Sequence, residues 1–314
     1  MPYVLRRCLL IVPTLLGVSF LGFALVNLAP GDPAEQFARR ITDHPPSFAE
    51  VAEARERLGL NHPIPVQFVR WIDHAAHNDL GISYATRQPV STELRRRIPK
   101  TLQLAVPAAL LALAIALPLG SYSAVRRGHP ADQIVRVGAM AGASMPSFWL
   151  ALLLILLFSV HLGWLPVAGR GGLDTFVLPI LTLALEPAAV LARFTRSTML
   201  EALGEDYIRT AQAKGAPQWR VVSRHALRNA LIPVVTYFGS RLGYLITGAV
   251  VVESIFVWPG VGRLTVDAVA QRDYPMVQGV VVFAGLTFAV INLLVDLSYR
   301  LVDPRIGVGQ GVAR

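Results

Sequence analysis

Two ionisable side chains, Glu186 and Arg241, stand within stretches of the sequence that are otherwise apolar. If those stretches cross a membrane, a strongly polar residue near the centre costs about 2.5–3.5 kcal/mol on insertion scales. Both side chains should therefore face protein or water, and charged groups in such positions often line the route of a solute. We expect Glu186 and Arg241 to line a translocation path for a charged or zwitterionic solute, as a mutual pair or separately. The alternative is that each contacts a neighbouring chain.

A second chemical candidate is the pair of imidazoles at His74 and His77, with Asp73 and Asp79 close by in the sequence. Residues three apart share one face of a helix, so both rings could reach one cation. A structural zinc site usually has four protein ligands, however, and two histidines on a wet helix are more often solvated. We therefore expect no metal site and keep His74 and His77 only as weak candidates.

The sequence lacks the common motifs of catalysis. It contains no G-x-x-x-x-G-K-[ST] phosphate loop, so this chain is not expected to hydrolyse ATP. Neither the H-E-x-x-H zinc motif nor the G-x-S-x-G nucleophile motif occurs. We expect no catalytic residues and no cofactor in this chain.

The composition is that of a membrane protein. Of 314 residues, 54% are apolar and 16% are charged, and the mean hydropathy is +0.50. Soluble domains usually have about 45–50% apolar and about 25% charged residues. The single cysteine, Cys8, excludes an internal disulfide. A net charge of +9 could suggest nucleic acid, but arginine-rich cytoplasmic loops explain it more simply, so no nucleic-acid partner is expected.

The elements that must position these residues are six long apolar runs. Crossing the hydrocarbon core of a bilayer takes about 20 helical residues. The runs lie at residues 9–28, 102–125, 134–160, 176–191, 230–252 and 277–297. The first is too long for the apolar region of a typical signal peptide, so we expect it to be retained. The sequence predicts an all-α membrane protein with six transmembrane helices.

Prolines and glycines inside these runs suggest kinks and close packing. Pro146, Pro187 and Pro233 can kink or end a span. The glycine pairs at 138/142 and 239/243 have the spacing that permits two helices to approach closely.

The distribution of arginine and lysine gives the orientation. Basic residues gather before the first run, between the second and third, between the fourth and fifth, and in the tail. Basic loops stay in the cytoplasm, so both termini are expected there. The outer segment 30–99 carries nine arginines, but a loop of that length translocates largely regardless of its charge.

The outer segment has the signals of a folded helical insertion. Ser47 and Glu50 have the spacing of a capping box, which predicts a helix from about residue 48 to 58 that Gly59 could close. Pro65 suits the first turn of a second helix ending near Gly81. We expect a helical cap over the outer membrane surface.

Residues 193–229 form a long basic connection between the fourth and fifth runs. Apolar residues alternate with charges at helical spacing, and Gly204 and the Gly-Ala-Pro at 215–217 interrupt the pattern. The pattern predicts two short amphipathic helices that meet at a glycine turn. A soluble motor could push on such a lever; a basic loop attracted to anionic lipid is the alternative.

Several stretches resemble the permeases of ABC importers, most closely the dipeptide/oligopeptide/nickel subgroup. The main one is DYIRTAQAKG at 206–215, followed by RHALRNALIP at 224–233, which resembles the EAA loop of that family. The others are APGDP at 29–33, DLGIS at 79–83, SMPSFW at 144–149, ESIFVWPGVGR at 253–263, RDYP at 272–275 and DPR at 303–305. They run from end to end of the chain.

The resemblance implies a heteromeric importer in the bacterial inner (plasma) membrane. This chain would pair with a second, similar permease, two ATP-binding subunits and an extracytoplasmic solute-binding protein, and ATP and Mg²⁺ would bind to the ATP-binding subunits. It implies three regions: residues 1–29 (cytoplasmic N-terminus and first span), 30–99 (periplasmic insertion) and 100–314 (core permease domain, with the coupling loop at about 193–229).

The resemblance also assigns roles to residues. Residues 210–220 would form a coupling helix seated in a groove of the ATPase. The residues expected to contact it are Arg209, Thr210, Ala211, Ala213, Lys214, Gly215 and Ala216. In the wider family the loop opens Glu-Ala-Ala, where this chain has Arg209-Thr210-Ala211. Trp258, Pro259 and Gly260 would help form the outer gate.

Alternatives remain open at this point. The solute is expected to be a dipeptide, oligopeptide or similar small molecule; nickel or a metal chelate is the alternative within the same class. The alternative of another class is an ion-coupled secondary transporter, which often shows internal inverted repeats. We see no convincing repeat between the two halves of this sequence.

Overall fold

The computed structural model describes the chain except residues 1, 29–30, 43, 170–171, 248 and 303–314, and the side chains of 2–8, 25–28, 240–241, 244, 246–247 and 296–302. Within these limits the chain is helical, and an isolated bridge between Ile82 and Pro89 is the one β pairing. It divides into two compact units. Unit 1 comprises residues 1–101 and 259–290, and unit 2 comprises 102–258 and 291–314.

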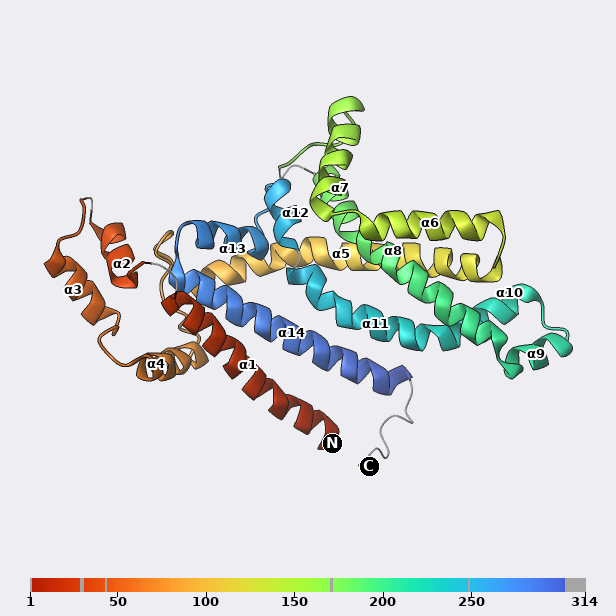
Figure 1. The fold of residues 1–314 in the computed structure, drawn as a ribbon, viewed down its shortest axis with the longest axis horizontal. Helices are drawn as coiled ribbons and strands as arrows, with labels where there is room; N and C mark the ends of the chain where they lie inside the picture. Colours follow the sequence, from red (N-terminus) through yellow and green to blue (C-terminus); the bar gives the residue numbers. More distant parts are fainter. Residues whose placement is uncertain (1, 29–30, 43, 170–171, 248, 303–314) are drawn as a thin grey trace. The chain divides into compact units, whose positions relative to one another are not determined.

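Unit 1 contains five whole helices and the starts of two others among its described residues (Figure 1). They are α1 (Pro2–Leu28), α2 (Pro33–Ile41), α3 (Phe48–Arg57), α4 (Ile64–Ala76), α13 (Val261–Ala270), and the start of both α5 (Val90–Val125) and α14 (Tyr274–Val302). Helix α1 lies along α14 because Gly22 and Gly285 leave room for Val281 and Val18 of the opposite helix. The start of α5 packs on α13 and α14 through Val90, Leu264 and Met276, all of which are buried.

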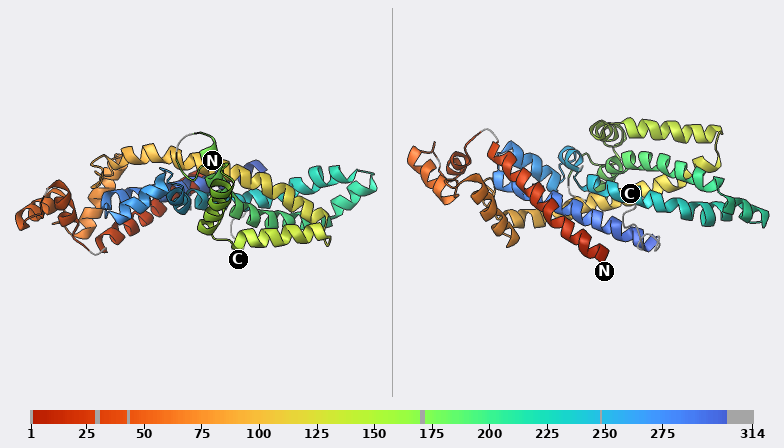
Figure 2. Two further views of the ribbon diagram at one scale, coloured as in Figure 1. Left: turned by 90° about the horizontal axis from the view of Figure 1, so that it is seen from above. Right: turned by 60° about the horizontal axis from the view of Figure 1, so that its bottom comes forward.

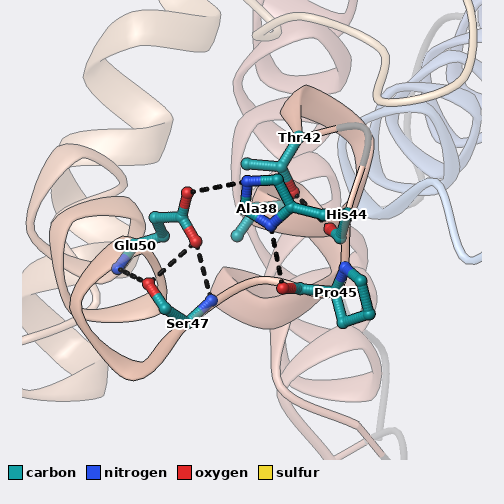
Figure 3. Close-up of polar contacts among 6 residues, drawn as sticks. All are labelled: Ala38, Thr42, His44, Pro45, Ser47 and Glu50. Atoms are coloured by element: carbon teal, nitrogen blue, oxygen red, sulfur yellow. Dashed lines mark hydrogen bonds and ion pairs between the residues drawn. The ribbon is translucent and has the colours of Figure 1, made fainter.

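The capping box predicted at Ser47 is present and starts α3. The Ser47 backbone N–H donates to the Glu50 carboxylate at 2.7 Å, and the Glu50 N–H faces the Ser47 hydroxyl oxygen at 3.4 Å (Figure 3). These bonds satisfy amide groups that a helix start leaves without partners. The helix ends at Arg57, and Gly59 follows with a positive φ of 67°. The predicted helix 48–58 is thus confirmed.

Asp273 holds together two loops of unit 1. Its buried carboxylate accepts hydrogen bonds from the Ser83 hydroxyl and from the backbone N–H groups of Tyr84 and Ala85, at 3.0 and 3.2 Å from the two amides. A carboxylate with several donors tolerates burial, because each oxygen has partners. The turn at residues 80–89 is therefore fixed to the start of α14.

Unit 2 is built around one long helix, α8. Besides most of α5 and the end of α14, its other elements are α6 (Pro130–Ser144), α7 (Ser147–Leu154) with a π-helical continuation (Ile155–His161), α9 (Asp206–Ala213), α10 (Gln218–Arg220) with a π-helical turn (Val221–Ala226), α11 (Leu227–Thr247) and α12 (Ala249–Ile255). Helix α8 itself is Asp174–Gly204, and α6 lies along it in both views (Figures 1 and 2). Leu104 of α5, Leu178 of α8 and Phe256 after α12 share its largest buried cluster.

Three helices are long and apolar enough to cross a membrane within the described residues. They are Val90–Val125, Asp174–Gly204 and Tyr274–Val295; a shorter apolar helix covers Leu9–Ala24. The predicted span 134–160 is not one straight helix: α6 and α7 bend by 106° at a break at Met145 and Pro146, as a broken span or a re-entrant loop does. Met145 is extended (φ −85°, ψ 119°), the conformation that a following proline favours, so α6 must end there.

Candidate functional site

Glu186 lines a cavity of about 300 Å³ in unit 2. Its walls come from the start of α7, the middle of α8 and α11, and include Ser147, Thr182, Tyr237, Phe238 and Leu245. Tyr237 is held in place by stacking on Phe194, with ring centroids 4.7 Å apart. A carboxylate beside hydroxyl groups in a mostly apolar hollow is suited to a small cationic or zwitterionic group.

The carboxylate of Glu186 has no hydrogen bond or ion pair within the part of the chain that the structure describes, and the side chain is exposed in the single chain. Pro187 follows it inside α8 and has no N–H to donate to the carbonyl of Leu183, which weakens the helix locally. The predicted pairing of Glu186 with Arg241 lies outside the described side chains. Glu186 lies beside this cavity, and its role in a translocation path stays a prediction.

The loop predicted at 193–229 begins later than expected. Helix α8 continues to Gly204, so Arg193 and Arg196 belong to this helix rather than to a loop. Two short helices then meet at a turn, as the pattern predicted. The predicted coupling helix 210–220 is wrong as a single helix, because α9 ends at Ala213 and Gly215 adopts a positive φ of 78°.

We call residues 206–217 the α9 segment. Its inner face is anchored by Ile208, which is buried against Met199 of α8 and Val221. Its outer face presents several of the residues assigned to coupling. Those exposed are Arg209, Thr210, Ala213, Lys214 and Gly215, and those partly buried are Ala211 and Ala216. The segment therefore offers a polar surface on a fixed base.

Two aromatic side chains add to this surface, and the sequence reasoning missed both. Trp219 is 67% exposed, with the Arg220 guanidinium 5.3 Å from its ring centre, and Tyr207 is 38% exposed. Exposed aromatic and arginine side chains are typical of protein–protein interfaces. The signal available in the sequence was their position beside the basic residues of the loop.

Unit 2 also contains a buried ion pair that was not predicted from the sequence. Asp132, at the start of α6, is only 1% exposed and accepts two hydrogen bonds from the Arg196 guanidinium. It also accepts bonds from the Ser123 hydroxyl near the end of α5 and from the Gly128 N–H. Three helices are thereby joined shortly before the α9 segment. No spacing rule connects residues 64 positions apart.

The residues assigned to an outer gate are buried. Trp258 is 4% exposed and packs its ring edge-on against Phe176 at 4.7 Å, both in unit 2. The backbone N–H of Trp258 donates to the Glu253 carbonyl at 2.7 Å, and Val257 before it has a positive φ of 55°. In unit 1, Pro259 is buried and Gly260 is the residue before α13. Trp258 is thus a core anchor of unit 2.

His74 of α4 and His77, which directly follows this helix, each bind a nearby group of the protein. The His74 Nδ1 lies 3.1 Å from the Asp79 carboxylate, and the His77 Nδ1 lies 2.8 Å from the Asp73 carbonyl. Both side chains are exposed. Across the described residues, no three His, Cys, Asp or Glu side chains are placed to hold a metal ion.

Comparisons with known proteins cover nearly the whole chain. Residues 116–308 match the family described as "Binding-protein-dependent transport system inner membrane component", and residues 1–105 match its N-terminal region. The Glutathione transport system permease protein GsiC of Salmonella paratyphi A (strain ATCC 9150 / SARB42) is 45% identical over 97% of this chain and 98% of its own length. The protein of that name from Escherichia coli (strain K12) is 44% identical with the same coverage.

Two solved structures share the fold. The MetNI methionine ABC transporter in an inward-facing conformation matches with a TM-score of 0.54 at 20% identity, covering 67% of this chain and 96% of that chain. An amino acid ABC transporter solved with histidines gives a TM-score of 0.53 at 14% identity, covering 67% and 94%. At these identities the likeness concerns the fold alone.

Proposed function

Because this chain belongs to the family of binding-protein-dependent inner-membrane transport components, as a permease subunit of an ABC importer, we propose that it carries a glutathione-like peptide inward. The observation that carries this proposal is the 45% identity, over 97% of the chain, to permeases named for glutathione transport. Family membership replaces the alternative of an ion-coupled secondary transporter, since ABC importers are driven by ATP hydrolysed in separate subunits.

We propose six spans with both termini in the cytoplasm and residues 30–99 outside. The arginine distribution supports this orientation. The three long apolar helices, the bent α6–α7 pair and the apolar part of α1 supply five of the spans, and α11 with α12 would supply the sixth.

The cavity beside Glu186 would be part of the translocation path. A peptide has a positively charged amino group, which the carboxylate of Glu186, unpaired among the described residues, could bind directly. The hydroxyl groups of Ser147 and Tyr237 could bind the amide groups of the same solute. Arg241 of α11 would bind the carboxylate of the same peptide, so that the two residues line the path separately. A direct pair of Glu186 with Arg241 is the other arrangement expected from the sequence.

The α9 segment would be the contact with an ATP-binding subunit. Its support is the exposure of Arg209, Thr210, Ala213, Lys214 and Gly215 on a base fixed by Ile208. Ala211 and Ala216 would act from the inner face by holding the turn in shape. Closure of the ATPase pair would then shift the permease between inward-open and outward-open states.

The complete importer would contain this chain, a second similar permease, two ATP-binding subunits with ATP and Mg²⁺, and an external solute-binding protein. The outer gate would include Trp258, Pro259 and Gly260. Because all three are buried, we expect them to form its fixed base and not its moving part.

The test is uptake by the complete importer in liposomes, with ATP inside and the solute-binding protein and radiolabelled glutathione outside. We expect accumulation that requires ATP, resists an ionophore and is competed by short peptides. Accumulation that follows an imposed ion gradient without ATP would contradict ATP-driven import. ATPase stimulation by another solute, with no glutathione uptake, would show that the proposed cargo is wrong.

A further inference from the structure

A second cavity, of about 650 Å³, lies within unit 1. Residues of α1, α2, α3, α4, the turn at 80–84 and the start of α14 line it. Small-molecule sites in proteins usually have volumes of about 300–1,000 Å³, so this cavity is large enough for a di- or tripeptide.

Aromatic rings form its walls and hold each other in place. Phe37 packs edge-on against Tyr84 with ring centroids 5.4 Å apart, and Tyr84 packs edge-on against Tyr274 at 6.5 Å. Phe23 and Trp71 also line the cavity, with ring centroids 6.2 Å apart. Because Asp273 also fixes the backbone of Tyr84, this wall is formed before any ligand arrives.

The hydroxyl of Tyr274 is a buried polar group that lacks a partner among the described residues. Tyr274 is 7% exposed, lines the cavity, and makes no hydrogen bond through its hydroxyl to any residue that the structure describes. Buried polar atoms are almost always hydrogen-bonded, and a lone one calls for a ligand or an ordered water. Burial raises the pKa of the neighbouring Tyr84, which keeps its phenol neutral and able to donate.

The charges around the cavity favour an anion. Arg57 and Arg70 both line it, are exposed, and have no ion pair within the described residues. The carboxylate that lines it, Asp79, already accepts a bond from the Gly81 N–H and lies 3.1 Å from His74. The two guanidinium groups are therefore left to bind a carboxylate or a phosphate.

We propose that this cavity is a second solute site, which binds the carboxylate end of the peptide through Arg57, Arg70 and the Tyr274 hydroxyl. The proposal rests on the proposed function, because it takes the cargo to be peptide-like. The aromatic walls suit the apolar parts of a peptide, and the phenols suit its amides. The same anion chemistry would also accept an anionic lipid headgroup, so the experiment separates these two sources.

The experiment measures binding of radiolabelled glutathione to the complete importer in nanodiscs of zwitterionic phosphatidylcholine, without ATP or solute-binding protein. We expect Arg70→Gln and Tyr274→Phe each to weaken binding at least five-fold. Glutathione diethyl ester, in which both carboxylates are blocked, should bind at least ten-fold more weakly. Arg95→Gln, an exposed arginine of unit 1 away from the cavity, is the matched control and should bind as wild type.

Tyr274→Phe also distinguishes a ligand role from a structural one. Removing an unpaired buried hydroxyl should raise or preserve the melting temperature. Weaker binding with preserved stability supports the site, whereas unchanged binding in both Tyr274→Phe and Arg70→Gln overturns it. If glutathione binding is weakened in Glu186→Gln but not in Arg70→Gln or Tyr274→Phe, glutathione binds in the unit 2 cavity. This result overturns the proposal as well.

Two further outcomes separate this proposal from the proposed function. ATP-driven glutathione uptake with no binding in the absence of the solute-binding protein overturns the second site alone. Absence of both uptake and binding removes the peptide cargo and the site together. If phosphatidylglycerol displaces the probe and co-purifies less with Arg70→Gln than with wild type, the cavity is a lipid headgroup site and the peptide assignment is wrong.

Discussion

The guanidinium of Arg196 on α8 binds both carboxylate oxygens of Asp132 on α6, with nitrogen–oxygen distances of 2.7 and 2.8 Å. Paired, bidentate bonds of this kind fix orientation as well as distance. Since Ser123 of α5 donates to the same carboxylate, the pair sets the mutual position of three helices. Force applied to the end of α8 therefore reaches α6 and α5 together.

Breaking this pair should destabilise unit 2 strongly. Arg196→Gln leaves the buried Asp132 carboxylate without its main partner, and loss of one member of a buried pair costs about 3–5 kcal/mol. We expect a lower melting temperature of the purified complex in mild detergent, together with weaker coupling of ATPase activity to uptake. Arg193→Gln, an exposed arginine one turn earlier on α8, is the control and should behave as wild type. Equal stability of the two variants would contradict the role of the pair.

Close packing of α5 on α8 depends on Gly120. A Cβ at this position would lie 2.6 Å from the Ala192 carbonyl oxygen and 2.6 Å from the Thr195 Cβ. Gly120→Ala must therefore push the helices apart, at a cost of about 1–3 kcal/mol for overpacking. The amount of folded protein in membranes and its melting temperature should both fall. Gly138→Ala, where a Cβ meets open space, is the matched control and should change neither.

The turn of the α9 segment needs a glycine at 215. Its φ of 78° is in the left-handed region, which costs other residues roughly 1–2 kcal/mol. Gly215→Val should lower solute-stimulated ATPase activity and uptake, while leaving membrane levels near normal because the residue is exposed. Gly204→Val is the comparison, since a Cβ there meets open space without a positive φ. Full activity in Gly215→Val would show that the shape of this turn is unimportant.

Neutralising Glu186 should impair uptake of solutes that carry an amino group. A hydrogen bond to a charged group contributes about 1.5–3 kcal/mol, so Glu186→Gln should reduce uptake roughly 10- to 100-fold at low solute concentration. Wild type should take up an N-acetylated peptide less well than the free peptide, and Glu186→Gln should take up the two equally. Glu201→Gln, on an exposed part of α8, is the control. Arg241→Gln tests the other half of the expected pair, and unchanged uptake and solute range in both variants would exclude this path.

Acid should loosen the start of α3. The Ser47 backbone N–H, followed by its hydroxyl, holds the pKa of Glu50 below its usual value of 4.5. Protonation is therefore harder in the folded helix than in the unfolded segment, so this stabilisation is present above pH 4.5 and is lost as the pH falls through the lowered pKa. Amide hydrogen exchange in α3, corrected for intrinsic rates, should speed up across that window. Glu50→Gln should abolish this pH dependence; persistence of the dependence would assign it to another group.

Local signals in the sequence predicted the local structure well. Ser47 and Glu50 stand three residues apart, and the bonds of a capping box act over that distance alone, so the α3 start could be predicted. Helix-length apolar runs likewise predicted α5, α8 and α14 as candidate spans. The bend at Pro146 was only partly predictable, because a proline can kink a helix mildly or end it, and the packing around it decides which.

Long-range pairings could not be predicted from one sequence. Asp132 and Arg196 look like ordinary loop charges until α6 and α8 are laid side by side. Asp273 stands in a short polar stretch, and its partners at residues 83–85 are about 190 positions earlier. The cavity of unit 1 draws on six separate parts of the chain, and each contributes an ordinary residue type on its own.

One consequence of α8 concerns mechanics. From Ala188 to Gly204 the helix contains no proline and is roughly 25 Å long at about 1.5 Å per residue. Pro187 makes the helix more flexible at the N-terminal end of this stretch, immediately beside Glu186. A stiff arm with a soft pivot converts a sideways push at its free end into a rotation at the pivot. A small sideways displacement of the helix near Gly204 would thus rotate it at Pro187. The carboxylate of Glu186 would then change its orientation, without moving along the helix axis.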